Sequence, residues 1–216
     1  MTLPNHIEPL TRRQMAERVV RDIPEGWYVN LGIGIPTIIA DVLPRDREIV
    51  VHSENGILGM GPVPAPEHRN DWLVNAGKQH VTLQTGGSYM HHADSFGIIR
   101  GGHLDLCVLG AYEVAENGDI ANWATSEADM APAVGGAMDL AVGAKRIWVM
   151  MEHTTKEGVA RLVHRCSYPL TALGVVQRIY TNLAVIDVTP RGFQIVEMVN
   201  GLTKEDLDVR TGAPLQ

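Results

Sequence analysis

The most informative stretch of this 216-residue chain occupies residues 48–62 and reads Glu48-Ile49-Val50-Val51-His52-Ser53-Glu54-Asn55-Gly56-Ile57-Leu58-Gly59-Met60-Gly61-Pro62. Its apolar beginning predicts a strand over 48–52, and the glycines that follow predict a turn. Glu54 is therefore expected at the carboxyl end of a strand, the edge at which open α/β sheets bind their ligands. We take Glu54 as the leading candidate for a functional side chain; the alternative is a glutamate that caps a turn in solvent.

The segments on either side alternate between helix and strand patterns. Thr11 and Gln14 form a capping box before an apolar stripe at helical spacing, which predicts a helix over 12–23. Further helices are predicted at 36–43, 137–144 and 203–210. Further strands are predicted at 27–31, 81–84, 104–109, 146–151, 183–188 and 193–199. The pattern favours a single α/β domain over 1–216, with a mainly parallel sheet and flanking helices.

Composition excludes several classes of protein. Apolar residues make up 45% and charged residues 20%, as is typical of a globular chain, and the net charge of −7 is unsuited to a nucleic-acid backbone. No apolar run approaches the roughly 20 residues of a membrane helix. The N-terminus contains no secretory signal core, and Cys107 and Cys166 form no disulfide framework. We therefore expect a cytoplasmic protein with reduced cysteines that binds neither nucleic acid nor membrane.

Two further glycine pairs could meet Glu54 in space. Gly32-x-Gly34 follows the predicted strand that contains Asn30, but it lacks the third glycine of a dinucleotide fingerprint. Gly135-Gly136 opens a predicted helix, where backbone N–H groups can hold an anion or a developing oxyanion. Tight packing between strand and helix explains each pair equally well.

The histidines are candidate metal ligands. His91, His92 and Asp94 lie close to His80 and His103 in the sequence, but their spacing matches no zinc motif. We expect no metal site and interpret His91 and His92 as a hydrogen-bonded pair on a loop. The sequence also contains no nucleophile elbow and no phosphate-binding P-loop, which argues against a serine hydrolase or a P-loop enzyme.

Five motifs follow one another along nearly the whole chain, at 28–34, 52–59, 75–78, 95–105 and 135–140. In this order they resemble the small (β) subunit of the 3-oxoacid CoA-transferases, and His52-Ser53-Glu54-Asn55-Gly56-Ile57-Leu58-Gly59 resembles the signature of that family. The resemblance implies the α/β fold that CoA-transferases share with some sugar-phosphate isomerases. It also implies that Glu54 is the catalytic carboxylate.

A carboxylate suits this chemistry because it is ionised at pH 7 and attacks an acyl-CoA without the help of a base. The resemblance implies a mixed anhydride and then a glutamyl-CoA thioester on Glu54. It places Asn30 beside the reacting carbonyl and Lys78 near substrate or CoA. The substrate- and CoA-binding residues that it implies are Asn30, Gly32, Gly34, Asn55, Gly56, Lys78, Gly135 and Gly136.

The resemblance also implies a partner and a substrate. A separate α subunit would complete a heterodimer or heterotetramer, with a CoA thioester as substrate and no permanently bound cofactor. Residues 91–96 and 121–134 resemble the 3-oxoadipate branch more than the acetoacetate branch, so we expect 3-oxoadipate as acceptor and succinyl-CoA as donor. Lys78, Arg100 and the histidines are candidates for binding the second carboxylate of such a substrate. Acetoacetate as acceptor, an acyl-CoA hydrolase and a non-catalytic binding subunit are the alternatives.

Overall fold

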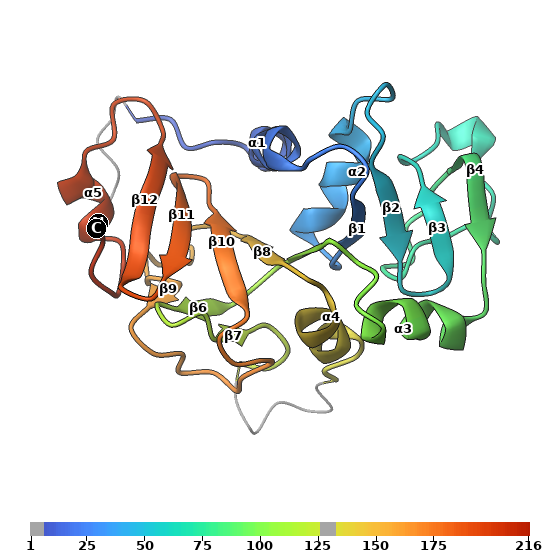
Figure 1. Cartoon of the computed structure of the whole chain (residues 1–216). Coiled ribbons are helices and arrows are strands. Elements are labelled where there is room, and N and C mark those ends of the chain that lie inside the picture. Colours follow the sequence, from blue (N-terminus) through green and yellow to red (C-terminus); the bar gives the residue numbers. More distant parts are fainter. Residues whose placement is uncertain (1–6, 126–132) are drawn as a thin grey trace.

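The computed structural model describes residues 7–125 and 133–216, and its largest feature is a nine-stranded sheet (Figure 1). The strand order is β12-β11-β10-β8-β5-β1-β2-β3-β4. The five central strands run parallel: β10 (Val176–Tyr180), β8 (Ile147–Met150), β5 (Leu106–Leu109), β1 (Tyr28–Leu31) and β2 (Val50–Ser53). The strands at the two edges are antiparallel: β11 (Ala184–Thr189), β12 (Gly192–Met198), β3 (Ile57–Met60) and β4 (Leu83–Tyr89). The predicted α/β fold with a mainly parallel sheet is confirmed.

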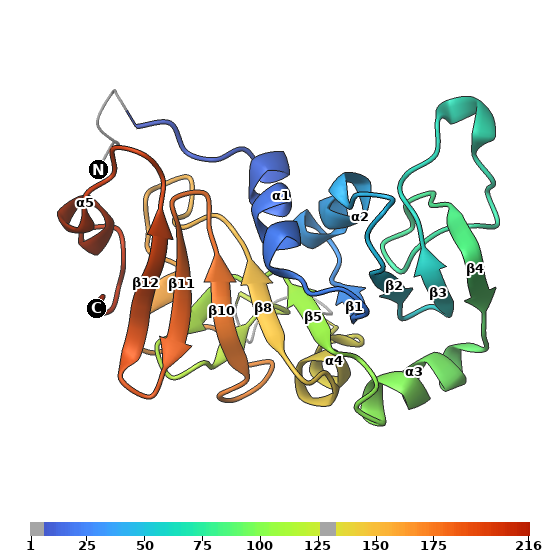
Figure 2. The ribbon, with the colours of Figure 1, turned by 45° about the horizontal axis from the view of Figure 1, so that its top comes forward.

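Helices cover both faces of this sheet (Figure 2). One face packs against α1 (Arg12–Asp22), the 3₁₀ turn η1 (Ile35–Ile38) and α2 (Ile39–Val42). The other packs against α3 (His92–Arg100), α4 (Ala137–Gly143), α5 (Lys204–Asp208) and a small sheet of β7 (Ile120–Ala121), β6 (Glu113–Ala115) and β9 (Leu162–Val163). A second 3₁₀ turn, η2 (Pro66–His68), lies between β3 and β4. Among the described residues, no helix is both long and apolar enough to cross a bilayer.

Strand β5 shows how the two cores are divided. Leu106 and Val108 belong to the core under α1, whereas Cys107 and Leu109 belong to the core under α4. Successive side chains of a strand point to opposite faces, so a central strand that is covered on both sides is apolar throughout. This explains why the run over 104–109 does not alternate between apolar and polar residues.

Several segments differ from the prediction, and two of them lie close to Glu54. The glycine-rich stretch after Glu54 predicts a turn, but residues 57–60 form β3, whose pairing with β4 shifts register between Leu58 and Met60, around Gly59 at φ +81°. The sequence places His92 on a loop, but it begins α3, and the ring of His91 caps that helix by accepting a hydrogen bond from the Ala93 N–H (3.1 Å). The loop interpretation of the histidine pair is therefore wrong for His92.

Candidate active site

Glu54 lies in a three-residue turn that joins β2 to β3. Ser53 pairs with Ile57 across the hairpin, and the Gly56 N–H donates to the Ser53 carbonyl (3.0 Å). Gly56 has a φ of +111°, and a Cβ at this position would collide with the carbonyl of Met90. The Met90 N–H in turn donates to the Gly56 carbonyl (2.9 Å), so the turn is fixed against the segment that leads into α3.

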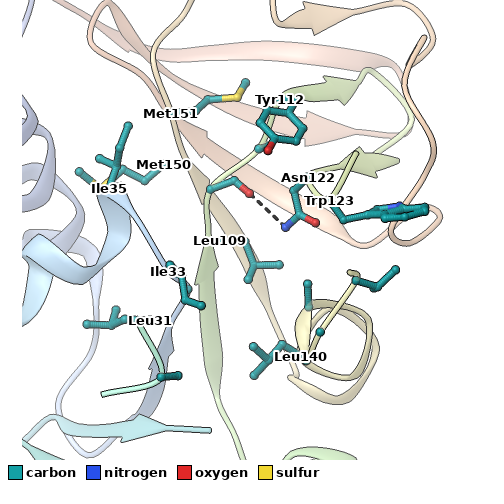
Figure 3. Close-up of a pocket in the computed structure, with 18 of the residues that line it drawn as sticks. Leu31, Ile33, Ile35, Leu109, Tyr112, Asn122, Trp123, Leu140, Met150 and Met151 are labelled. Carbon is teal, nitrogen blue, oxygen red and sulfur yellow. Dashed lines mark hydrogen bonds between the residues drawn. The ribbon is translucent and has the colours of Figure 1, made fainter. Parts of the chain in front are cut away.

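A cavity of about 500 Å³ opens beside this turn, at the carboxyl ends of the central strands (Figure 3). Leu31, Leu109 and Met150 are the last residues of β1, β5 and β8, and all three line it. This is the edge at which open α/β sheets bind ligands. Glu54 lines the same cavity, so the expected position of Glu54 at the carboxyl edge is confirmed.

The carboxylate of Glu54 packs directly over Gly136, the residue before α4. A Cβ added to Gly136 would lie 2.5 Å from Glu54 Oε2 and 3.0 Å from Cζ of Phe96. Burial raises the pKa of Glu54, the charge of Asp139 raises it further, and His92 opposes the shift. A carboxylate that has lost part of its hydration is a stronger nucleophile than one in water, because fewer water molecules must leave before it attacks.

The structure brings only some of the predicted site residues to the cavity. Gly32, Gly135 and Gly136 line it together with Glu54. The other predicted binding residues are not among the described lining residues, and they are Asn30, Gly34, Asn55, Gly56 and Lys78. Gly34 has a φ of +98° and precedes η1, and Lys78 has a φ of +63°. Their assignment to substrate or CoA stays a prediction.

Asn30 belongs to a buried network behind the turn. Its Nδ2 donates to His52 Nδ1 (3.0 Å), and its Oδ1 accepts from Cys107 Sγ (3.6 Å). Because Nδ1 of His52 accepts this bond, its Nε2 carries the proton and donates to Ser95 Oγ (2.9 Å). Burial lowers the pKa of His52 to about 4, so the ring is neutral at pH 7. The network joins β1, β2, β5 and α3, and no local pattern in the sequence identifies His52 as part of it.

The segment after η2 is also fixed to the turn. Asn55 Nδ2 donates to the Val74 carbonyl (2.7 Å), and the Ala76 N–H donates to Ser53 Oγ (3.1 Å). Ala76 lines the cavity, and Lys78 follows it in the same loop. The motif over 75–78 is therefore positioned by the two residues that flank Glu54.

The remaining candidates are the possible metal ligands and the two cysteines. Within residues 7–125 and 133–216, no group of three or more His, Cys, Asp or Glu side chains is placed to hold a metal ion. Cys107 and Cys166 are unpaired thiols, and burial raises the pKa of both, that of Cys166 to about 12. Neither thiol is a strong nucleophile at neutral pH. Part of the segment 121–134, which bears on the expected substrate, lies outside the described residues.

Comparisons with known proteins agree with this arrangement. The model of the family "Coenzyme A transferase" matches residues 12–207. One subunit of a 3-oxoadipate CoA-transferase of Pseudomonas putida is 57% identical over 206 residues, which cover 95% of this chain and 96% of the relative. One subunit of a probable succinyl-CoA:3-ketoacid coenzyme A transferase of Bacillus subtilis is 46% identical over 202 residues, covering 94% and 93%.

A solved structure shows the same fold. The apoenzyme of an acyl-CoA transferase from Escherichia coli O157:H7 superimposes with a TM-score of 0.72 at 17% identity. The match covers 100% of this chain but only 43% of that chain, so this chain corresponds to less than half of it. The chain belongs to the coenzyme A transferase family, and the resemblance given by its motifs is confirmed. The prediction that the chain is part of a CoA-transferase is thereby also confirmed.

Proposed function

We propose that this chain is the glutamate-bearing subunit of a two-subunit enzyme that moves CoA from succinyl-CoA to 3-oxoadipate. The observation that carries the proposal is the partly desolvated carboxylate of Glu54 at a cavity on the carboxyl edge of the sheet. The names of the relatives support the substrates: 3-oxoadipate for the Pseudomonas protein and succinyl-CoA for the Bacillus protein. Residues 1–216 would act as one domain in the cytoplasm, with CoA thioesters as substrates and no resident cofactor.

The reaction proceeds through two covalent states of Glu54. Its carboxylate attacks the carbonyl of succinyl-CoA, the C–S bond breaks, and a mixed anhydride and the CoA thiolate form. The thiolate then attacks the Glu54 carbonyl, which gives a glutamyl-CoA thioester and releases succinate. A carboxylate of 3-oxoadipate attacks this thioester, and the same two steps run in reverse, so that 3-oxoadipyl-CoA leaves and Glu54 is regenerated.

The neighbours of Glu54 have separate roles in this scheme. Gly136 leaves room for the carboxylate, and the backbone of Gly32, Gly135 and Gly136 borders the space where each tetrahedral centre forms. Asn55 and Gly56 shape the turn, and Asn30 is hydrogen-bonded to His52 in the strand that leads into it. Gly34 precedes η1. Lys78 is available to a phosphate or carboxylate of the substrate that approaches from solvent.

A second subunit completes the enzyme. Both relatives are named as one subunit of their enzymes, and the solved acyl-CoA transferase has a chain more than twice as long as the part that matches. Ile33 lines the cavity yet remains 64% exposed, so the wall of the cavity continues onto open surface. The α subunit would cover this rim and exclude water, because water would hydrolyse the thioester on Glu54.

Borohydride trapping tests the proposal. The complex with the α subunit is mixed with succinyl-CoA in the absence of acceptor, and the glutamyl thioester, unlike a free carboxylate, is reduced to an alcohol that peptide mass maps to residue 54. Glu54→Gln should assemble normally, show no trapped alcohol and lose several orders of magnitude in turnover. Trapping at another residue, or normal turnover by Glu54→Gln, would contradict the mechanism. Release of CoA without any acceptor would instead indicate a hydrolase, and a higher kcat/KM for acetoacetate would contradict the proposed acceptor.

A further inference from the structure

Arg161 is a cation in the same cavity that the proposed reaction leaves without a role. It lines the cavity and is only partly exposed. Its Nε is buried and has no hydrogen-bond partner among the described residues. Buried polar groups of native proteins are nearly always hydrogen-bonded, so an unpartnered one that lines a cavity is available to an acceptor on a ligand or a water molecule.

The backbone of Arg161 is held by segments other than those that carry Glu54. The Arg161 N–H donates to the His153 carbonyl (3.2 Å), and the Arg161 carbonyl accepts from the Val114 N–H (2.9 Å). Tyr112 and Met151 lie two residues before these partners, and Figure 3 shows both at one end of the lining, away from Leu31 and Leu140.

Glu54 meets the lining beside α4. Its carboxylate packs on Gly136, at the start of the helix that carries Leu140. The cavity wall also includes the apolar side chains of Leu109 and Met150. One cavity is therefore lined by a carboxylate, by an arginine that comes from other elements and by apolar side chains.

We propose that Arg161 binds the far carboxylate of a dicarboxylic acyl group whose other carboxyl carbon reacts at Glu54. This inference rests on the proposed function and assigns the residue that selects its substrate class. A guanidinium presents a planar fork of N–H donors that matches a carboxylate in bidentate geometry. The proposed acceptor, 3-oxoadipate, carries such a far carboxylate, and it lies two carbons further from the reacting carboxyl carbon than that of succinate, so Arg161 is assigned to the acceptor half of the reaction. Acetoacetate lacks a far carboxylate.

The neighbouring acidic group does not compete strongly for this arginine. Glu157 lies in the preceding turn, and its pKa is lowered mainly by a hydrogen bond from Thr155 and by its own backbone, with Arg161 a smaller cause. Glu157 is fully exposed, and within the described residues no ion pair joins it to Arg161. Arg165, on the same segment, is exposed and is not among the described lining residues, which makes it a matched control.

The test measures the second half-reaction alone. The complex with the α subunit is loaded with CoA by excess succinyl-CoA, freed of donor, and mixed with 3-oxoadipate or acetoacetate. Arg161→Gln should lower kcat/KM for 3-oxoadipate by about 100-fold or more and leave the value for acetoacetate within about threefold. Arg161→Lys should recover part of the loss, and Arg165→Gln should match the wild type.

Other outcomes separate this inference from the proposed function. An equal loss for both acids, or no loss for 3-oxoadipate, overturns the role of Arg161 while the thioester on Glu54 still forms. Failure of the wild type to form that thioester overturns both. A measurement on the wild type needs no variant: esterification of the far carboxylate of 3-oxoadipate should cost at least about 30-fold in kcat/KM, and an equally good ester contradicts the inference.

Discussion

Glu54 combines two properties that rarely occur together in one glutamate: it is partly buried, and it packs against a residue that has no side chain. The loss of solvation raises its pKa, and the missing Cβ of Gly136 lets its carboxylate lie against the backbone at the start of α4. The position of this one side chain thus depends on a glycine that lies far from it in the sequence. The pair should therefore respond together when either member is changed.

Gly136→Ala tests this dependence. Gly136 has a φ of −80°, which alanine adopts without strain, so the fold should survive. The new Cβ would displace the flexible end of Glu54, and a displacement of about 1 Å is expected to lower kcat by about 100-fold. Gly97→Ala is the control, because a Cβ at this exposed position in α3 would meet nothing within 4 Å. It should keep full kcat and gain roughly 0.5–1 kcal/mol in the free energy of unfolding; wild-type kcat in Gly136→Ala would refute the prediction.

The pH profile tests the electrostatics of Glu54. Only the ionised carboxylate attacks, so kcat/KM should fall as the pH drops through a pKa that burial has raised above the ordinary glutamate value. Asp139→Asn removes a charge that raises this pKa and frees Arg100, its ion-pair partner (2.7 Å). The acid limb should then move to lower pH.

His92→Gln should move the same limb in the opposite direction. The electrostatic effect of His92 lowers the pKa of Glu54, and its removal leaves burial and Asp139 unopposed. Both profiles are measured as kcat/KM for succinyl-CoA on the complete enzyme, because this parameter reports the ionisation of Glu54 in the free enzyme. Shifts of the same sign in the two variants would show that these charges do not act on Glu54.

At the scale of elements, the sequence predicts those whose local signals agree with their packing. The capping box of Thr11 and Gln14 and the apolar stripe behind it predict α1, and the structure shows both halves of that box. The central strands are predictable because burial on both faces makes them continuously apolar. The carboxyl edge, and Glu54 on it, follows directly from these strands.

The elements that local patterns miss depend on contacts between distant segments. The glycine in β3 argues against a strand, but Gly59 lies against Gly87 of β4, where a Cβ on Gly59 would be 2.8 Å from the Gly87 Cα. Residues 176–180 form β10, which no local signal predicts, and the same holds for the small sheet. The start of α3 depends on the cap that His91 provides. Ser95 of this helix is buried and is hydrogen-bonded to His52. None of these causes is visible within a window of neighbouring residues.

The residues of the candidate site also differ in whether local sequence patterns predict them. Glu54 and Gly136 lie in recognisable motifs, whereas Arg161 reaches the cavity only through the pairing of its backbone with β6 and with the residues after β8. Lys78, Arg100 and the histidines are the candidates that the sequence offers for a second carboxylate, but none of these is among the described lining residues. A cation that becomes a neighbour of the cavity through long-range pairing has no local signature.

At the scale of the whole molecule, the two edges of the large sheet differ in what they expose. Trp72, in the segment between β3 and β4, is 96% exposed, and Tyr89 of β4, which pairs with Ile57 next to the Glu54 turn, is 63% exposed. At the opposite edge, Val196 of β12 is 45% exposed. Trp and Tyr side chains are among those that contribute most to the affinity of protein interfaces. We expect the α subunit to cover the edge near Glu54.

Assembly tests this expectation directly. The purified chain alone should show no transferase activity, because its cavity rim at Ile33 is open, and adding the α subunit should restore turnover. Trp72→Ser should raise the Kd of the complex at least about tenfold while leaving the circular dichroism spectrum and Tm of the free chain unchanged, since the side chain buries almost nothing there. Val196→Ser, at the far edge, should assemble like the wild type and so controls for the loss of an exposed apolar side chain. Full activity without the α subunit would contradict the requirement for a partner, whereas an equal Kd for Trp72→Ser and Val196→Ser would place the partner on another face of the sheet.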